Sequence, residues 1–120
     1  MHSRVYDAFF AAQERLGLQG FMFCHMSHSY HSGACLYFTF AFQYTSEEKA
    51  LEEYLNAKQA VQQAFVDLGS TVSHHHAVGT EHQPWIVEDI GEVGVRMVKG
   101  LFADNDPGRN LNPPGKVVGV

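Results

Sequence analysis

The sequence predicts an α+β fold, an antiparallel sheet with helices packed on one face, that occupies residues 1–120. Residues 34–44 alternate large apolar side chains with small or polar ones, which is the period of a strand with two different faces. Residues 1–17 and 46–69 space their apolar residues at helical intervals, and each segment ends at a glycine. The resulting order, α-β-β-α-β-α, is typical of a ferredoxin-like piece of a larger sandwich.

The first half of the chain supplies a helix and two strands. Val5, Phe9 and Ala12 follow one helical face of residues 1–17. The apolar run 21–26 has the length of a buried strand, and the polar segment 27–33 is expected to be a loop.

The strand predicted at 34–44 has two unlike faces. One face is large and apolar and is expected to pack on helices, while the other is small and polar and carries a single phenol, Tyr37. Such a division is typical of a sheet with one side lining a cavity. The alternative is an ordinary half-buried strand tyrosine. The apolar face consists of Leu36, Phe38, Phe40 and Phe42, and the other of Cys35, Tyr37, Thr39 and Ala41.

The second half begins with the helix at 46–69, which is capped by Ser46 and has an apolar stripe that is expected to be core. Residues 70–79 are predicted as a third, short strand because β-branched residues lead into it. Pro84 suits the first turn of a last helix. The stripe of the 46–69 helix consists of Leu51, Tyr54, Leu55, Val61, Phe65 and Leu68.

The amino-acid composition indicates which kinds of partner and ligand to expect. Charged residues make up only 18% of the 120 residues, against about 25% in typical domains, so some apolar surface is expected to meet a partner. A three-stranded sheet also leaves an exposed edge, and we therefore expect a homo-oligomer. The net charge of −5 and the lack of a Lys/Arg run argue against nucleic acid as a ligand.

The cellular location of the protein and the redox state of its cysteines are expected from sequence signals that are absent. The sequence shows neither a signal peptide nor an apolar run of transmembrane length, so a cytoplasmic protein is expected. Cys24 and Cys35 lie in apolar runs without a CxxC motif and are expected to be buried, reduced thiols.

Three consecutive histidines, His74, His75 and His76, are the most unusual feature of the chain. In an extended segment His74 and His76 point to one side and His75 to the other, and all three titrate near neutral pH. One alternative is a histidine-rich surface loop. Another is a metal site, but zinc needs three or four ligands and the other histidines have no fixed spacing to this motif, so no metal is expected.

Three segments together resemble a known family. The first is 27–42, with Ser27-His28-Ser29-Tyr30 and the strand after Gly33, and the second is 73–79, with the triple histidine. The third is Trp85 followed by 108–117, with Leu111-Asn112-Pro113-Pro114-Gly115-Lys116. The chain resembles the C-terminal, cap-domain part of alkyldihydroxyacetonephosphate synthase-like FAD-linked oxidases, in the vanillyl-alcohol oxidase superfamily. The triple histidine is the specific part of the resemblance, and the closing Asn-Pro-Gly-Lys-like signature indicates an FAD-linked oxidase in general.

The resemblance implies that the chain is the C-terminal part of a cap, or substrate, domain that covers a flavin. The FAD would be held by a separate N-terminal FAD-binding domain, which these residues lack, so the fragment alone is not expected to bind it. The implied reaction of the complete enzyme exchanges the acyl chain of acyl-dihydroxyacetone phosphate for a fatty alcohol and gives an ether lipid precursor. The substrate would thus be lipid-like.

The resemblance also assigns roles to residues of this chain. Tyr37 is implied as the acid/base, and His75 and His76 as contacts of substrate or flavin that share in catalysis. His74 is expected to support them and, together with Asn112 of the closing signature, to belong to the cofactor-binding side of the site. An imidazole with a pKa near neutrality suits removal of a proton beside a carbonyl, and a phenol suits donation to a departing carboxylate.

The chain departs from the family pattern at Ala77, where glycine is common, at residues 80–83, which lack the usual basic residues, and at the additional Pro114. One alternative is therefore a fragment of an FAD-dependent 2-hydroxy acid dehydrogenase or oxidase. Those relatives usually have Glu-His-Gly at the histidine motif. Another alternative is an α+β module that binds a partner without catalysis.

Overall fold

The structure, a computed structural model, describes residues 1–111, 113 and 115–118. It confirms the α+β class with three helices and a two-stranded antiparallel sheet among these residues. The chain divides into two compact units, Met1–Leu68 and Gly69–Val120, and each is described by itself. The elements are α1 (His2–Leu16), β1 (Gln19–Tyr30), β2 (Gly33–Gln43), the 3-10 turn η1 (Glu47–Lys49), α2 (Ala50–Asp67), the 3-10 turn η2 (Gln83–Trp85) and α3 (Ile86–Asn105).

Helix α1 forms where it was predicted. Its apolar face is fully buried at Val5 and Phe9. It ends at Gly17, which adopts φ = 68° in the left-handed region, and the amide of Leu18 then donates to the carbonyl of Gln13 at 2.9 Å. A glycine accepts this conformation without a steric penalty, so the chain turns directly into β1.

Strands β1 and β2 form one long hairpin. The segment 27–33 was expected to be a loop, and this expectation is wrong for Ser27–Tyr30, which continue β1 to a tight turn at residues 31–32. The polar side chains are tolerated because this end of the hairpin is exposed on the surface. One extra residue, Ser27, lies between Met26 and His28 and forms a β-bulge, since Met26 pairs with Leu36 and His28 with Cys35.

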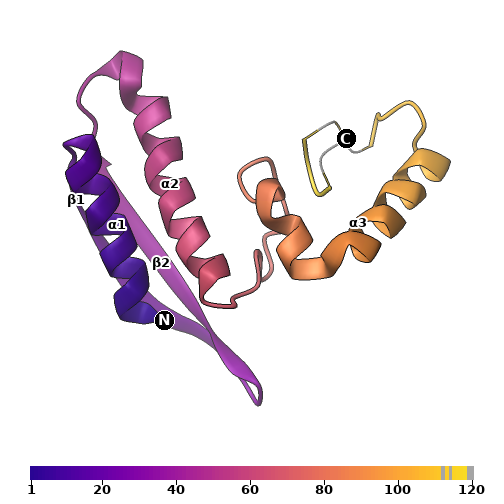
Figure 1. Cartoon of the computed structure of the whole chain (residues 1–120), viewed down its shortest axis with the longest axis horizontal. Helices are drawn as coiled ribbons and strands as arrows, with labels where there is room; N and C mark the ends of the chain where they lie inside the picture. Colours follow the sequence, from indigo (N-terminus) through magenta and orange to yellow (C-terminus); the bar gives the residue numbers. More distant parts are fainter. Residues whose placement is uncertain (112, 114, 119–120) are drawn as a thin grey trace. The chain divides into compact units, whose positions relative to one another are not determined.

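Helices α1 and α2 lie side by side on one face of the hairpin, as Figure 1 shows. The core between them contains Val5, Phe9, Met22 and Val61, and the apolar face predicted for β2 packs against it through Phe38, Phe40 and Phe42. The arrangement of helices on one sheet face is therefore confirmed for this unit.

The apolar stripe predicted for α2 is confirmed toward its end, where Val61 is buried and Phe65 and Leu68 pack against the core, and is wrong at its start. Leu51 is 70% exposed and Leu55 is also exposed, while Glu53 and Ala57 face inward. The carboxylate of Glu53 accepts hydrogen bonds from the backbone amide of Thr45, at 2.9 Å, and from the Thr45 hydroxyl. These bonds allow an acidic side chain to take the inward position at the start of the helix.

The second unit consists mainly of α3 and the loops before and after it. The predicted third strand at 70–79 does not form, because the described sheet has only two strands and residues 70–79 are irregular with bends. Local side-chain bonds replace a strand ladder: the Thr71 hydroxyl donates to the carbonyl of Ser73, and the Ser73 hydroxyl to the carbonyl of Ala77, whose φ is 63°.

Helix α3 begins shortly after Pro84, as predicted, and contains a kink. Gly91 has φ = 69° and ψ = 168°, a conformation that is essentially restricted to glycine. None of the described helices is both long enough and apolar enough to span a membrane.

Candidate functional site

Tyr37 lies on β2, on the sheet face opposite to α1 and α2. Its neighbours in the strand, Leu36 and Phe38, point toward the helices, so the alternation of a strand places Tyr37 on the open face. Its side chain is 40% exposed. The face division predicted for this strand is thus confirmed, and Tyr37 belongs to its small and polar face.

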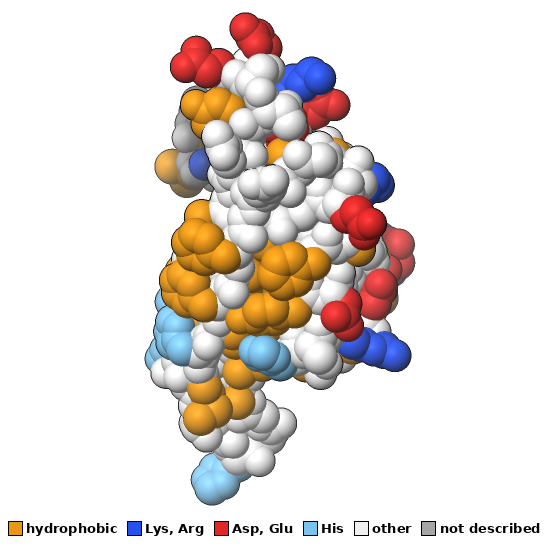
Figure 2. Space-filling view, turned by 90° about the vertical axis from the view of Figure 1, so that its left-hand side faces the viewer, with side chains coloured by type: hydrophobic (Ala, Val, Ile, Leu, Met, Phe, Trp, Pro, Cys, Tyr) orange, Lys and Arg blue, Asp and Glu red, His pale blue; other side chains and the backbone are white. Residues whose placement is uncertain are grey.

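The open face of the hairpin carries a row of aromatic and histidine side chains. The strand pairing places Phe21 opposite Ala41, Phe23 opposite Thr39 and His25 opposite Tyr37. Phe21 and Phe23 are 59% and 49% exposed, and their rings stack at a centroid distance of 6.3 Å. Figure 2 shows hydrophobic side chains gathered over the middle of the view with histidine side chains beside them.

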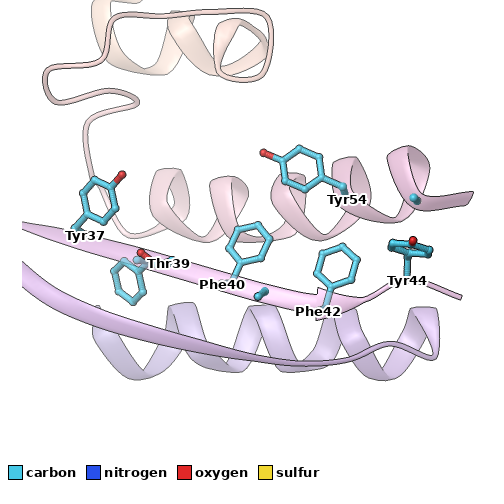
Figure 3. A pocket seen from close by; sticks show the side chains of 9 residues that line it. Tyr37, Thr39, Phe40, Phe42, Tyr44 and Tyr54 are labelled. Atoms are coloured by element: carbon cyan, nitrogen blue, oxygen red, sulfur yellow. The ribbon is translucent and has the colours of Figure 1, made fainter. Parts of the chain in front are cut away.

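A groove of about 440 Å³ follows the outer edge of β2 beside α2, and residues from both faces of β2 line it. Figure 3 shows Phe40 and Phe42 of β2 directed toward Tyr54 of α2, with Tyr37 at one end of the groove and Tyr44 at the other. The rings of Phe40 and Tyr54 stack at 6.2 Å. Tyr37 therefore lies at the mouth of an apolar groove that ends in phenolic hydroxyls, a lining typical of a site for an apolar molecule with a polar end.

The three histidines lie in the loop before η2 in the second unit, and all three side chains are exposed. One contact anchors this loop to its own unit: the hydroxyl of Thr71 lies 3.0 Å from the Asp89 carboxylate on α3. The side chain of Val72 is buried. The loop thus presents its imidazoles outward from a fixed base.

The rings within the triplet are in mutual contact. Nδ1 of His74 lies 2.7 Å from Nδ1 of His75, and the rings of His75 and His76 are perpendicular with centroids 4.1 Å apart. In an N–H···N bond one ring must donate and the other must accept, so at least one of His74 and His75 is neutral while the bond exists. The two rings are therefore joined through a single N–H group.

Three groups in the first unit, Cys24, Glu48 and Glu53, have environments that shift their pKa values. Desolvation raises the pKa of the Cys24 thiol, which favours its protonated form. Cys24 and Cys35 are free thiols, as predicted, but both are half-buried and not buried. Hydrogen bonds from the side chain and, to a smaller extent, from the backbone amide of Thr45 lower the pKa of Glu53. Glu53 stabilises the start of α2 and is not part of the open face of the hairpin.

The closing segment after α3 is held by a carboxylate. Asp106 accepts hydrogen bonds from the backbone amides of Asn110 and Leu111, both at 2.8 Å, and so fixes the turn that leads into the closing signature. Asn112, expected on the cofactor side, lies outside the described residues.

The structure thus places Tyr37 in the first unit and His74, His75 and His76 together in the second. It also shows a residue that the sequence reasoning missed, His25, whose ring stacks on that of Tyr37. Only the pairing register of the hairpin could have indicated this contact from the sequence. The β-bulge at Ser27 shifts that register by one residue.

Comparison with known proteins gives a family match and several curated relatives. The sequence profile described as "FAD linked oxidases, C-terminal domain" matches residues 2–117. An alkyldihydroxyacetonephosphate synthase of Dictyostelium discoideum is 34% identical over 97 residues, which are 81% of this chain and 16% of the relative. The synthase of Trypanosoma brucei brucei is 32% identical over 102 residues, 85% of this chain and again 16% of the relative.

A more distant relative has a different name. An "Uncharacterized FAD-linked oxidoreductase YgcU" of Escherichia coli K12 is 26% identical over 91 residues, 73% of this chain and 19% of the relative. The chain thus spans less than a fifth of the length of these curated relatives.

Proposed function

Because this chain belongs to the family of FAD-linked oxidase C-terminal domains, we propose that it forms the substrate- and flavin-facing wall of an alkyldihydroxyacetonephosphate synthase-like enzyme. The enzyme would convert acyl-dihydroxyacetone phosphate and a fatty alcohol into an alkyl ether lipid precursor. The observation that carries the proposal is the phenol of Tyr37, exposed on the open sheet face at the mouth of an apolar groove. The triple histidine gives independent support.

The described residues suit contact with the ring system of the flavin better than binding of the diphosphate of FAD. The first turns of α2 and α3 carry acidic residues, Glu52 and Glu53 in one and Glu88 and Asp89 in the other, and negative charge there disfavours a phosphate. The exposed imidazoles His75 and His76 can instead contact the ring system or the substrate. FAD, held by the rest of the enzyme, would supply the electrophilic ring chemistry.

In this proposal the protein side chains move protons. A proton beside the substrate carbonyl would be removed by an imidazole of the triplet, and the His74–His75 bond allows that proton to be shared between two rings. Tyr37 would donate its phenolic proton to the departing carboxylate oxygen. The apolar groove beside it would keep the alkyl or acyl chain out of water.

The test uses the complete enzyme reconstituted with FAD under anaerobic conditions. The visible absorbance of the flavin is followed on addition of acyl-dihydroxyacetone phosphate and, separately, of D-2-hydroxy acids. Bleaching by the acyl substrate alone supports the synthase. Bleaching by a hydroxy acid would instead favour the dehydrogenase or oxidase alternative, and an unchanged spectrum with both would contradict both enzymes.

Variants then test the residues. Tyr37→Phe and the double variant His75→Ala/His76→Ala are expected to lower the rate of product formation by about 10²–10⁴-fold, the range for loss of a general acid or base. Tyr30→Phe and His31→Ala are matched controls, since they remove a hydroxyl and an imidazole from the exposed tip of the same hairpin. Controls that lose as much activity as the test variants would refute the residue assignment.

A further inference from the structure

We propose that His25 is a positioning residue for Tyr37: its imidazole stacks on the phenol and fixes the direction of the phenolic hydroxyl. The inference rests on the proposed function for the role of Tyr37, but its geometry is independent of the identity of the substrate. His25 is outside the triple histidine and has no role in the family resemblance above.

The two rings are brought together by the strand pairing. His25 on β1 and Tyr37 on β2 are direct cross-strand partners, and their ring centroids are 5.4 Å apart with an interplanar angle of 25°. Direct partners on one face are the pairs that interact most strongly in a sheet. The imidazole therefore covers one flank of a phenol that is otherwise 40% exposed.

The other neighbours of Tyr37 on its own strand cannot supply such a wall. The next residues of β2 on the open face are Cys35 and Thr39, both with short side chains. An exposed tyrosine on a strand can adopt more than one χ1 rotamer, and a flat ring directly opposite restricts that choice. His25 is thus the aromatic group that the pairing places against the Tyr37 ring.

The β-bulge determines which residue of β1 lies opposite Tyr37. With a two-residue turn at 31–32 and no bulge, Met26 would pair with Tyr37. The extra residue Ser27 shifts the register, so that His25 takes the place opposite the phenol. Bulges commonly re-aim side chains next to functional sites, and here the bulge exchanges a flexible thioether for a planar ring.

The kinetic consequence follows from orientation. A proton donor works when its hydroxyl is held within hydrogen-bond reach of the departing oxygen, and a small misplacement costs rate without affecting substrate affinity. Removal of the ring at position 25 should therefore lower kcat and leave KM unchanged. Because the role is filled by a flat ring, phenylalanine should substitute for histidine.

The experiment compares His25→Ala and His25→Phe in the complete FAD-loaded enzyme. We expect His25→Ala to lower kcat by about tenfold at constant KM, and His25→Phe to restore it to within about twofold. The midpoint of thermal unfolding should fall only slightly in His25→Ala, because an exposed cross-strand pair contributes little to stability, and less in His25→Phe. His28→Ala is the matched control: His28 is on the same strand, is exposed and stacks on Tyr30 at 6.2 Å. It should leave kcat unchanged.

A spectroscopic measurement tests the contact without reference to activity. 3-Fluorotyrosine is placed at position 37 of the same enzyme, and its ¹⁹F resonance is recorded in each variant. His25→Ala should shift the resonance and change its width, His25→Phe should retain most of the ring-current effect, and His28→Ala should do neither.

The outcomes separate this inference from the proposed function. An unchanged ¹⁹F resonance in His25→Ala overturns the inference, even if activity falls. Equal loss of kcat in His25→Ala and His25→Phe also overturns it, since the imidazole nitrogens and not the flat ring would then be required. Full activity of Tyr37→Phe, with a His25-dependent resonance, would refute the catalytic role of Tyr37 and leave the ring contact intact.

Discussion

Glu53 is a charged side chain that is buried at the start of α2. Its carboxylate is held by the amide and the hydroxyl of Thr45, and these hydrogen bonds lower its pKa. An ordinary glutamate titrates near 4.3 in an unfolded chain. Since the folded form has the lower pKa, its contribution to stability is complete above that value and is lost as the pH falls through the folded pKa.

We therefore predict that Glu53→Gln lowers the free energy of unfolding at pH 7, and that the difference from the unchanged chain shrinks as the pH falls below about 4. Urea denaturation followed by circular dichroism between pH 7 and pH 3 measures this. Glu52→Gln, on the exposed side of the same helix turn, is the control for loss of one negative charge. A constant difference between Glu53→Gln and the unchanged chain over this pH range would contradict the prediction.

At the same scale, the residues of the candidate site were only partly predictable. Tyr37 could be placed on the open face because strand alternation depends on the residue types alone. His25 could not be placed opposite it, because the bulge at Ser27 depends on twist and pairing that no local pattern specifies. The side-chain contacts of the three histidines likewise depend on the loop formed by Ser73 and Ala77.

Among the elements, the hairpin depends on a close approach between α1 and the two strands. A Cβ at Gly20 would collide with the backbone carbonyl of Ala41 and with the side chains of Gln13 and Phe42. Gly20→Ala should thus lower the free energy of unfolding by about 1–3 kcal/mol, as overpacking does. Gly33→Ala, near the other end of the hairpin with open space around it, should change it little or raise it slightly. Chemical denaturation of both variants measures these changes in the free energy of unfolding. Equal effects of the two substitutions would contradict the close approach at Gly20.

Helix α3 offers two glycines with opposite expected effects. Gly91 is in the kink with φ = 69°, whereas Gly100 is in the helix interior with open space around it. Gly91→Ala should destabilise by about 1–3 kcal/mol because of backbone strain, and Gly100→Ala should stabilise by about 1 kcal/mol through helix propensity. Helical circular dichroism during thermal unfolding measures both. A stabilising Gly91→Ala would mean that α3 is continuous in solution.

Element prediction succeeded where the periodic pattern was long. Helices α1 and α3 and strand β2 followed from their spacing, since burial of one face imposes a period on the sequence. The third strand at 70–79 failed because two β-branched residues are too few to establish pairing against the local bonds of Thr71 and Ser73. The stripe predicted for α2 was right at Val61, Phe65 and Leu68. It was wrong at Leu51 and Leu55, because Glu53, held by the hydrogen bonds from Thr45, takes the inward position at the start of the helix.

For the whole molecule, the class and the family could be recognised, since both depend on patterns spread over most of the chain. The expectation that copies of the chain associate rests on two features of the first unit: the outer edge of β2 in its two-stranded sheet, and the exposed rings of Phe21 and Phe23 on the open face. Edges and apolar patches of this kind favour contact between copies.

We predict that the 120-residue chain self-associates with increasing concentration, as measured by light scattering. Phe23→Lys, on the open face, should lower the association constant. Leu111→Lys, a change of similar character at a residue that is 83% exposed outside the sheet, should leave it unchanged. A single monomeric species at all concentrations would refute the expected association, and equal effects of the two lysines would exclude the open face as the contact.

The division into two units has an optical consequence. All five tyrosines, at positions 6, 30, 37, 44 and 54, belong to residues 1–68, whereas the single tryptophan, Trp85, belongs to residues 69–120. Each unit therefore contains its own natural chromophore, and tryptophan emission can be excited selectively at long wavelength while tyrosine absorbance reports the other unit. Coincident changes of the two signals during denaturation would identify a single cooperative transition, and separate changes would assign a stability to each unit without any label.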